Sequence, residues 1–176
     1  EISTRKQTIL KHFDAVASNY LQYRNRFSYY GKDIINYLNF FVSETDSVLE
    51  IGCGCGETIH GLKATNKTGI DFSPKMIEVA KANFTEVDFF VMDAENISLE
   101  KKYDVIIFNN IIGYLDNIQD VLYSIKKNCH EHTRVIISYY NHYWEPILNT
   151  GETLGYKKKS PQQNWLDSKD ISNLLY

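Results

Sequence analysis

A glycine-rich bend directly after a short apolar run is the feature that most constrains the fold of this chain. Residues 48–51 are apolar except for Glu50, and Gly52, Gly54 and Gly56 follow at alternate positions. Glycines let a turn be tight and let a ligand approach the backbone closely. The N–H groups of a helix that begins after the bend would face an anionic group such as a carboxylate. The pattern therefore predicts a strand, a ligand-binding turn and a helix in succession.

Further apolar runs predict a mainly parallel sheet. Each run is too short for a helix and is bounded by turn or polar residues, which is typical of a buried strand. The clear runs cover residues 47–51, 87–92, 103–109 and 133–139, and a weaker run covers residues 67–71. Helical patterns alternate with these runs, so we expect right-handed βαβ units and a Rossmann-like, doubly wound α/β fold.

The helical patterns can be placed by their caps and apolar stripes. Ser73 is a good N-cap and Pro74 suits the first helical position, so a helix should run from there towards Phe84. Two more are expected over about residues 4–23 and 118–127. We predict a single domain over residues 1–176, made of a helical lid (1–40), a cofactor-binding core (41–140) and substrate-side helices (141–176).

Composition limits the kind of partner. The 176 residues are 43% hydrophobic and carry a net charge of −3, which is ordinary for one globular domain and gives no broad basic surface for nucleic acid. No apolar stretch reaches the roughly 18–20 residues that cross a bilayer, so we expect a cytoplasmic protein. Cys53 and Cys55 lack the spacing of a zinc or redox motif, and we expect no metal.

The chain begins without methionine and stops within an apparent helix, so we expect a longer polypeptide with room for a fused domain.

Polar side chains follow the ends of four expected strands. Glu50 ends the first, Asp71 the second, and Asn109 the fourth, while Asp93 comes just after the third. In a doubly wound sheet these positions share the edge at which ligands bind. An acid about 20 residues after a glycine-rich turn is placed to bind ribose hydroxyls, and Asp93 is placed to accept a hydrogen bond from an adenine amine. Glu50 is placed to face a cationic group.

The glycine spacing argues against a dinucleotide. The G-x-G-x-x-G pattern requires its third glycine one residue later than Gly56, and Glu57 occupies that place. A carboxylate there would lie poorly beside a pyrophosphate. A nicotinamide-dependent oxidoreductase is therefore the less favoured alternative.

These motifs together resemble those of class I S-adenosylmethionine-dependent methyltransferases. The similar segments are residues 50–56 (EIGCGCG), 71–76 (DFSPKM), 93–95 (DAE) and 103–107 (YDVII), and residues 13–20 (FDAVASNY) resemble the helix that often lids the cofactor. The likeness is closest to the small-molecule branch similar to quinone-biosynthesis methyltransferases. Residues 138–146 also resemble methyltransferase domains found near bacterial cell-surface glycan enzymes. This fold normally ends with an antiparallel strand pair, which the chain lacks.

The resemblance implies S-adenosylmethionine as the cofactor and assigns residues to it. The cofactor-binding set is Glu50, Gly52, Cys53, Gly54, Gly56, Asp71 (ribose hydroxyls), Phe72 and Met76 (flanking the adenine), Asp93 and Ala94 (adenine edge) and Asn109 (methionine end). The substrate-side set is Tyr20, Tyr114, Tyr140, Asn141 and Trp144. His142 follows the last expected strand and is the candidate general base, although a lone histidine is more often structural.

We therefore expect methyl transfer from S-adenosylmethionine to a small-molecule or glycan-linked acceptor. Such a protein has mainly to align the acceptor with the methyl carbon and the sulfur, and it needs a base only when the acceptor must lose a proton. A catalytically inactive cofactor-binding module is the other alternative.

Overall fold

Five parallel strands form one sheet in the order β3-β2-β1-β4-β5. The computed structural model describes residues 3–25, 28–139, 145, 146, 150, 153, 161, 164, 170 and 173. The strands are β1 (Ser47–Ile51), β2 (Asn66–Asp71), β3 (Asp88–Val91), β4 (Tyr103–Asn109) and β5 (Cys129–Ser138). The chain order reverses between β1 and β4, which makes their carboxyl ends the switch point of a doubly wound sheet. The predicted Rossmann-like fold is confirmed.

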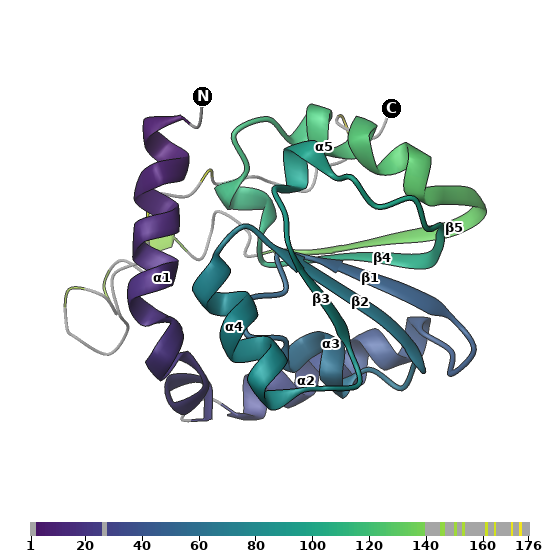
Figure 1. Ribbon diagram of the computed structural model, residues 1–176, viewed down its shortest axis with the longest axis horizontal. Coiled ribbons are helices and arrows are strands. Elements are labelled where there is room, and N and C mark those ends of the chain that lie inside the picture. Colours follow the sequence, from purple (N-terminus) through teal and green to yellow (C-terminus); the bar gives the residue numbers. More distant parts are fainter. Residues whose placement is uncertain are drawn as a thin grey trace.

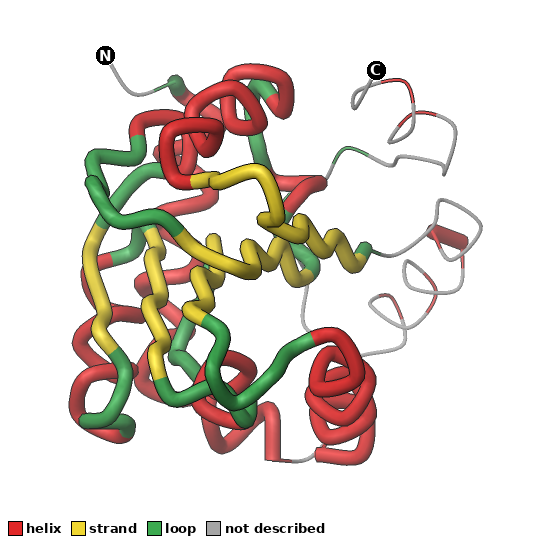
Figure 2. The backbone as a smooth tube through the Cα atoms, turned by 90° about the vertical axis from the view of Figure 1, so that its right-hand side faces the viewer, coloured by secondary structure: helices red, strands yellow, loops and turns green. Residues whose placement is uncertain are grey.

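Helices cover both faces of this sheet (Figures 1 and 2). They are α1 (Thr4–Asn25), α2 (Ser28–Phe41), α3 (Glu57–Gly61), α4 (Pro74–Asn83) and α5 (Ile118–Ser124), joined by the 3₁₀ turns η1 (Ala94–Asn96), η2 (Ile112–Tyr114) and η3 (Ile125–Asn128). As predicted, Ser73 caps α4, because its hydroxyl oxygen accepts a hydrogen bond from Met76 N. None of the described helices is long and apolar enough to cross a membrane.

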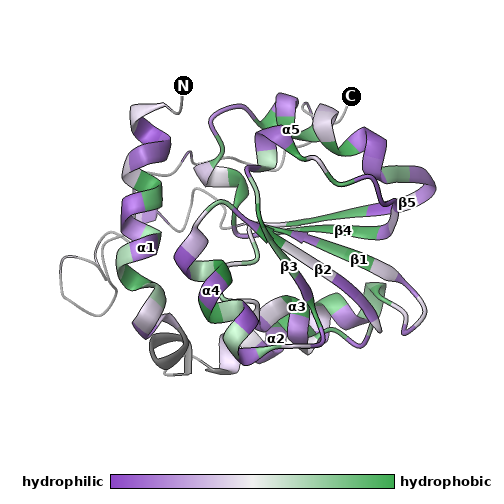
Figure 3. Cartoon of the chain, in the orientation of Figure 1, coloured by the Kyte–Doolittle hydropathy of each residue, from purple (hydrophilic) through white to green (hydrophobic). Residues whose placement is uncertain are grey.

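The core lies in two layers because successive residues of a strand point to opposite faces. On one face Val48 of β1 packs with residues of α2, α3 and α4. On the other face Leu49 and Ile51 pack with residues of α5 and η1. β4 alternates in the same way, and Figure 3 shows hydrophobic residues along β1 and β4 in the middle of the sheet. A sheet that is buried on both faces explains why these strands are almost continuously apolar.

The outer elements depart from the sequence predictions. The strand expected to be buried over residues 87–92 is the edge strand β3, in which Phe90 and Val91 are 42% and 51% exposed. The prediction of burial is wrong for these two residues because β3 has a neighbour on one side only. The helix expected over residues 118–127 is α5 followed by η3. β5 begins at Cys129 rather than residue 133, and its register with β4 shifts between Tyr103 and Val105.

The predicted lid, residues 1–40, contains two helices that pack differently. α1 stands across the end of the sheet towards which the strands run (Figure 1). α2 instead lies on a face of the sheet, where Leu38 is buried in the core. Asn39 of α2 also donates a hydrogen bond from Nδ2 to the carbonyl oxygen of Gly61 at the end of α3. Among the residues that the structure describes, no antiparallel strand joins the sheet.

Candidate cofactor-binding site

The glycine bend after β1 is fixed to the end of β2. The backbone N–H groups of Gly52 and Cys53 both donate to the carbonyl oxygen of Ile70, at 2.8 and 3.0 Å. Gly52, Gly54 and Gly56 have positive φ angles of 71°, 54° and 83°, which L side chains rarely adopt. A Cβ atom on Gly52 would lie 2.1 Å from Ile111 Cδ1, whereas one on Gly54 would meet no atom within 4 Å. The bend is therefore packed at Gly52 and open at Gly54.

Asp71 connects this bend to the start of α4. Its Oδ2 accepts a hydrogen bond from Gly54 N and its Oδ1 accepts one from Ser73 N, both at 2.9 Å. Burial raises the pKa of the Asp71 carboxyl group, the two backbone N–H groups oppose that shift, and the negative charge of Asp14 adds to it. The carboxylate predicted to bind ribose thus lies beside the open glycine, held by two backbone donors.

Two carboxylates give the bend a negative potential. Glu50, at the end of β1, is 2% exposed. Burial and the charges of Asp71 and Glu50 raise the pKa of the Cys53 thiol well above its ordinary value. Cys53 therefore stays a neutral thiol, and it packs in the core against the sheet rather than lining open space. Such a potential favours a cationic ligand group over an anionic one.

The loop after β3 is paired with α1. Asp93 caps η1 by accepting a hydrogen bond from Glu95 N. Its Oδ2 also lies 2.6 Å from Lys6 Nζ, which forms a second ion pair with Glu95 at 2.8 Å. Ala94 is buried in the core next to them. Asp93 and Ala94 thus lie together in the loop after β3, and the Asp93 carboxylate already has a partner on α1.

Asn109, at the end of β4, lies in a network of neutral polar groups. Its Nδ2 donates to Thr58 Oγ1 at 3.1 Å, and its Oδ1 accepts from Ser138 Oγ at 2.6 Å. The next residue, Asn110, has a φ of 55°, which turns the chain away from the strand towards η2. Asn109 is therefore fixed by α3 and β5 at the switch point of the sheet.

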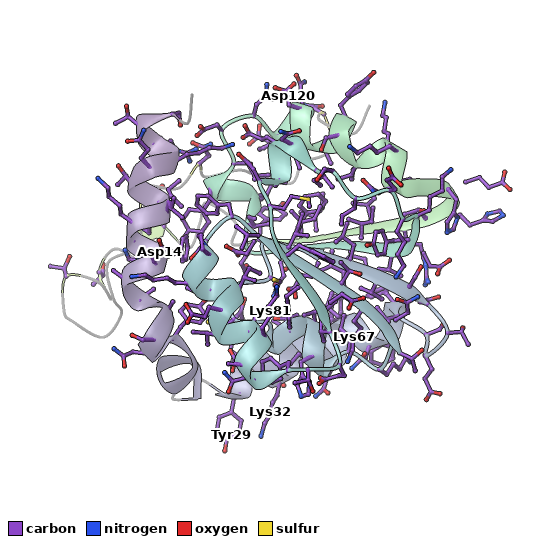
Figure 4. All side chains as sticks on the ribbon, viewed as in Figure 1. Asp14, Tyr29, Lys32, Lys67, Lys81 and Asp120 are labelled. Atoms are coloured by element: carbon purple, nitrogen blue, oxygen red, sulfur yellow. The ribbon has the colours of Figure 1, made fainter. Side chains whose placement is uncertain are left out.

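α1 closes over all four loops. Its Ala17 carbonyl oxygen lies 4.0 Å from Cys55 Sγ in the glycine bend. The Arg5 guanidinium donates to the carbonyl oxygens of Gly113, Tyr114 and Leu115 and forms an ion pair with Asp116 at 2.8 Å. Asp14 projects towards α4 and accepts a hydrogen bond from Ser73 Oγ (Figure 4). With the ion pairs of Lys6, these contacts reach the loops after β1, β2, β3 and β4.

Some predicted site residues belong to this helix interface. Met76 is 1% exposed, its Sδ lies 3.2 Å from Cys55 Sγ, and Tyr20 packs on the same small cluster. Tyr114 makes an edge-to-face contact with Phe13. Phe72 is half-buried beside Asp71 in the chain. The predicted Tyr140, Asn141, His142 and Trp144 lie outside the described residues.

The sequence did not reveal the cations of α1. Lys6 and Asp93 are separated by 87 residues, and Arg5 and Asp116 by 111, so no local spacing signals either pair. Asp14 stands in the quoted lid motif, yet its partner Ser73 was recognised only as a helix cap. The alignment of oppositely charged residues on α1 with those after β3 and β4 becomes visible only in the folded chain.

Comparison with known proteins gives the same class as the fold. A family described as "Methyltransferase domain" matches residues 43–173. A malonyl-[acyl-carrier protein] O-methyltransferase of Bacillus cereus is 34% identical over 125 residues, which are 66% of this chain and 46% of that protein. A ubiquinone biosynthesis O-methyltransferase of Rickettsia conorii is 30% identical over 100 residues, covering 53% of this chain and 35% of that one. The chain spans about half the length of the first of these relatives.

Solved structures share the fold at low identity. An S-adenosylmethionine-dependent methyltransferase of Thermotoga maritima, described as a possible histamine N-methyltransferase, superposes with a TM-score of 0.78 at 16% identity, covering 95% of this chain and 78% of that one. The plantazolicin methyltransferase BpumL, solved with S-adenosylhomocysteine, gives 0.59 at 22% identity, with coverages of 99% and 71%.

Strand order, glycine bend and strand-end acids define the class I S-adenosylmethionine-dependent methyltransferase domain, whose cofactor is S-adenosylmethionine. This chain belongs to the methyltransferase domain family. Two features of its own structure fit that cofactor. Gly54 leaves open space that a side chain would fill, and the carboxylates of Glu50 and Asp71 provide the potential that a sulfonium and an ammonium group require.

Proposed function

We propose that this protein transfers a methyl group from S-adenosylmethionine to an oxygen atom of a small-molecule acceptor, and that a carboxylate is the acceptor group it suits best. The observation that carries the proposal is the juxtaposition of Gly54, Asp71 and Glu50 at the switch point of the sheet. The two sequence relatives support the choice of oxygen, since both are named as O-methyltransferases.

Different residues of the site would contact different parts of the cofactor. The open backbone at Gly54 would receive the methionine portion, and the acidic pair Glu50 and Asp71 would favour its positive charges. Asp71 would accept the ribose hydroxyls, and Asp93 would meet the adenine amine after exchanging its contact with Lys6. Asn109, held between Thr58 and Ser138, would present a fixed amide to the methionine end.

Little covalent chemistry remains for the protein. The cofactor supplies a methyl group that its own sulfonium charge has already activated. The bend and the strand-end acids hold the donor in one orientation, and alignment of this kind contributes several kcal/mol to a displacement. α1, which contacts the loops after β1 to β4, covers part of this edge of the sheet.

A carboxylate acceptor fits this arrangement because it is ionised at neutral pH and needs no base. A hydroxyl acceptor, such as a sugar in a glycan, must lose its proton during transfer, and His142 is then the residue that the sequence offers. The glycan-linked acceptor is therefore the second candidate. It is favoured by the likeness of residues 138–146 to methyltransferases near glycan enzymes.

The pH dependence of turnover separates these acceptors. The purified protein is incubated with S-adenosylmethionine and either a malonyl-carrier protein or an oligosaccharide panel, and methylated product is measured by mass spectrometry. We expect ester formation on the carboxylate with a kcat that is flat between about pH 5.5 and 8, because a carboxyl group is ionised there. Transfer to a sugar hydroxyl with a kcat that falls below about pH 6.5 would favour the glycan reading.

The variants Asp71→Ala and Asp33→Ala complete this experiment. Asp71→Ala should weaken cofactor binding by about 1.5–3 kcal/mol, as expected for lost charge-assisted hydrogen bonds. Asp33 is an exposed residue of α2, so the same substitution there serves as the matched control. Binding of the cofactor without transfer to any acceptor would leave the inactive binding module as the function.

A further inference from the structure

A chain of hydrogen bonds runs from the lid helix to the glycine bend. Ser73 Oγ donates to Asp14 Oδ1 of α1 at 2.6 Å. Ser73 N donates to Asp71 Oδ1, and Gly54 N donates to Asp71 Oδ2, both at 2.9 Å. Ser73 is completely buried, so water cannot replace its partners while α1 is docked. The Asp71 carboxylate is therefore connected through Ser73 to a helix that lies far away in the sequence.

The Ser73 hydroxyl group both donates and accepts a hydrogen bond in this chain. A hydroxyl has one proton and two acceptor lone pairs. Its proton goes to Asp14, and its oxygen accepts the hydrogen bond of Met76 N at 3.2 Å, which caps α4. The direction of the proton fixes the direction of the lone pairs. Asp14 thus holds the Ser73 rotamer that keeps the turn between β2 and α4 in place.

That turn sets the position of the Asp71 carboxylate. Each carboxylate oxygen has room for about two donors. Each oxygen of Asp71 receives one backbone N–H, so each retains acceptor capacity for a second donor. Two adjacent acceptors of this kind match two adjacent hydroxyl groups.

We propose that Asp14 is a positioning residue for the ribose end of the cofactor, acting through Ser73 on Asp71 when α1 is docked. This inference rests on the proposed function, because it takes the nucleoside of that cofactor as the ligand of Asp71. It adds a coupling: docking of α1 sets the orientation of a carboxylate on the sheet, besides covering it.

The negative charge of Asp14 repels the Asp71 carboxylate that Asp14 helps to position. Its negative charge lies close enough to Asp71 to raise the pKa of that carboxyl group. A neutral acceptor would hold the Ser73 hydroxyl without this repulsion. The hydrogen bond is therefore the property that positions Asp71, and Asp14→Asn should preserve it while Asp14→Ala removes it.

Isothermal titration calorimetry with two ligands tests this coupling. The ligands are S-adenosylhomocysteine and its analogue without the 2′ and 3′ hydroxyls. For Asp14→Ala we expect about tenfold weaker binding of S-adenosylhomocysteine and less than twofold weaker binding of the analogue, as for the loss of one net hydrogen bond at the ribose. Asp14→Asn should stay within about threefold of the wild type for both ligands, and the exposed control Asp33→Ala should bind both unchanged.

If Asp14 had only a structural role, Asp14→Ala would not change the ratio of the affinities for the two ligands. Equal weakening of both ligands by Asp14→Ala would mean that Asp14 only docks α1, and unchanged binding would mean that it has no role. If Asp14→Ala melts below the assay temperature, Ser73→Ala removes the linking hydroxyl instead. Ser73→Ala should then show the same loss of hydroxyl selectivity. Where Asp14→Ala stays folded, the double variant should lose no more selectivity than Ser73→Ala alone, since contacts in one chain are not additive.

The calorimetric test of the coupling can fail independently of the turnover test of the proposed function. Calorimetry needs no acceptor, so a protein that binds S-adenosylhomocysteine but methylates nothing overturns the proposed function and leaves the coupling testable. If no variant loses selectivity for the ribose hydroxyls, the coupling is overturned even when methyl transfer is observed.

Discussion

Gly52 and Gly54 both have a positive φ angle, but their surroundings differ. At Gly52 the side chain of Ile111 fills the place of a Cβ atom, so glycine is needed for packing between the bend and the loop after β4. At Gly54 that place is open, and the N–H group of Gly54 itself donates to Asp71 Oδ2. Packing therefore requires glycine at Gly52, while Gly54 leaves the space in which we propose that the ligand lies.

Substitution of each glycine by alanine should separate the two roles. Gly54→Ala should cost about 1–2 kcal/mol of unfolding free energy, the penalty for a left-handed L residue, and should weaken S-adenosylhomocysteine binding more than tenfold because the new methyl group occupies the open space. Gly52→Ala should unfold the protein at a lower temperature than Gly54→Ala, since it adds a clash with Ile111. Thermal melts and calorimetry measure both effects. A larger stability loss in Gly54→Ala would contradict this assignment.

At the residue scale the sequence predicts the position of a side chain when its neighbours in the fold are also close in the chain. The glycines and Asp71 could be predicted because a bend, a strand and an acid follow each other within a short stretch. The structure places Met76 under α1 against Cys55, and its contact with the adenine stays a prediction. The sequence could not show this packing, because the apolar face of a helix and a ligand-facing position look alike in sequence.

The elements of the sheet are also tied at their starting ends, far from the site. Asp104, near the start of β4, accepts hydrogen bonds from the N–H and the hydroxyl of Ser47 at the start of β1, both at 2.7 Å. Its other oxygen lies 3.0 Å from His130 Nε2 in β5. The Ser47 donors, and to a smaller extent His130, hold the pKa of the Asp104 carboxyl group below its ordinary value. One carboxylate thus links three neighbouring strands.

Asp104→Ala should destabilise the protein in a pH-dependent way. The pKa of Asp104 is lowered in the folded state, so its contribution is present above the unfolded pKa of about 3.9 and is lost as pH falls through the folded value. The side chain is 41% exposed, so solvent screening limits the expected loss to about 1 kcal/mol at pH 7. Urea unfolding at pH 7 and below pH 4 measures the difference, which should shrink in acid. Asp88→Ala, at the exposed start of β3, is the control and should change stability by less than about 0.5 kcal/mol at either pH.

Element boundaries were harder to predict than element types. The capped helix α4 was placed from Ser73 and Pro74 alone, because a cap is a local signal. β5 begins four residues before the expected start. The added residues, 129–132, show little of the apolar pattern of a strand. Cys129 pairs with Tyr103 of β4, and the register shift before the pair of Val105 and Arg134 falls across the rest of this stretch. The packing of α2 on the sheet likewise depends on residues distant in the chain.

For the whole molecule, strand order is the feature that joins fold and ligand. The order β3-β2-β1-β4-β5 places the bend after β1 beside the end of β4, with the acids after β2 and β3 on one side of it. Alternating strands and helices were sufficient to predict this order class. They were not sufficient to predict how α1 closes the edge, since its ion pairs connect residues about a hundred positions apart.

Ligand-dependent stability of the whole molecule distinguishes the expected cofactor from a nicotinamide. S-adenosylhomocysteine at a hundredfold excess over its Kd should stabilise the folded chain by about 2.7 kcal/mol and raise Tm by about 5–10 °C. NADH at the same concentration should raise Tm by less than about 1 °C, because Glu57 follows the bend where a pyrophosphate would need glycine or alanine. Differential scanning fluorimetry measures both. A larger shift with NADH would restore the oxidoreductase alternative.

Every residue that we assign to the cofactor comes from the stretch between Glu50 and Asn109, while all the acceptor-side candidates lie outside it. The residues that we assign to the methyl donor thus form one continuous stretch of the sequence. We expect that exchange of the segment after β5, with α1 and Asp14 kept, would redirect the same methyl group to a new recipient.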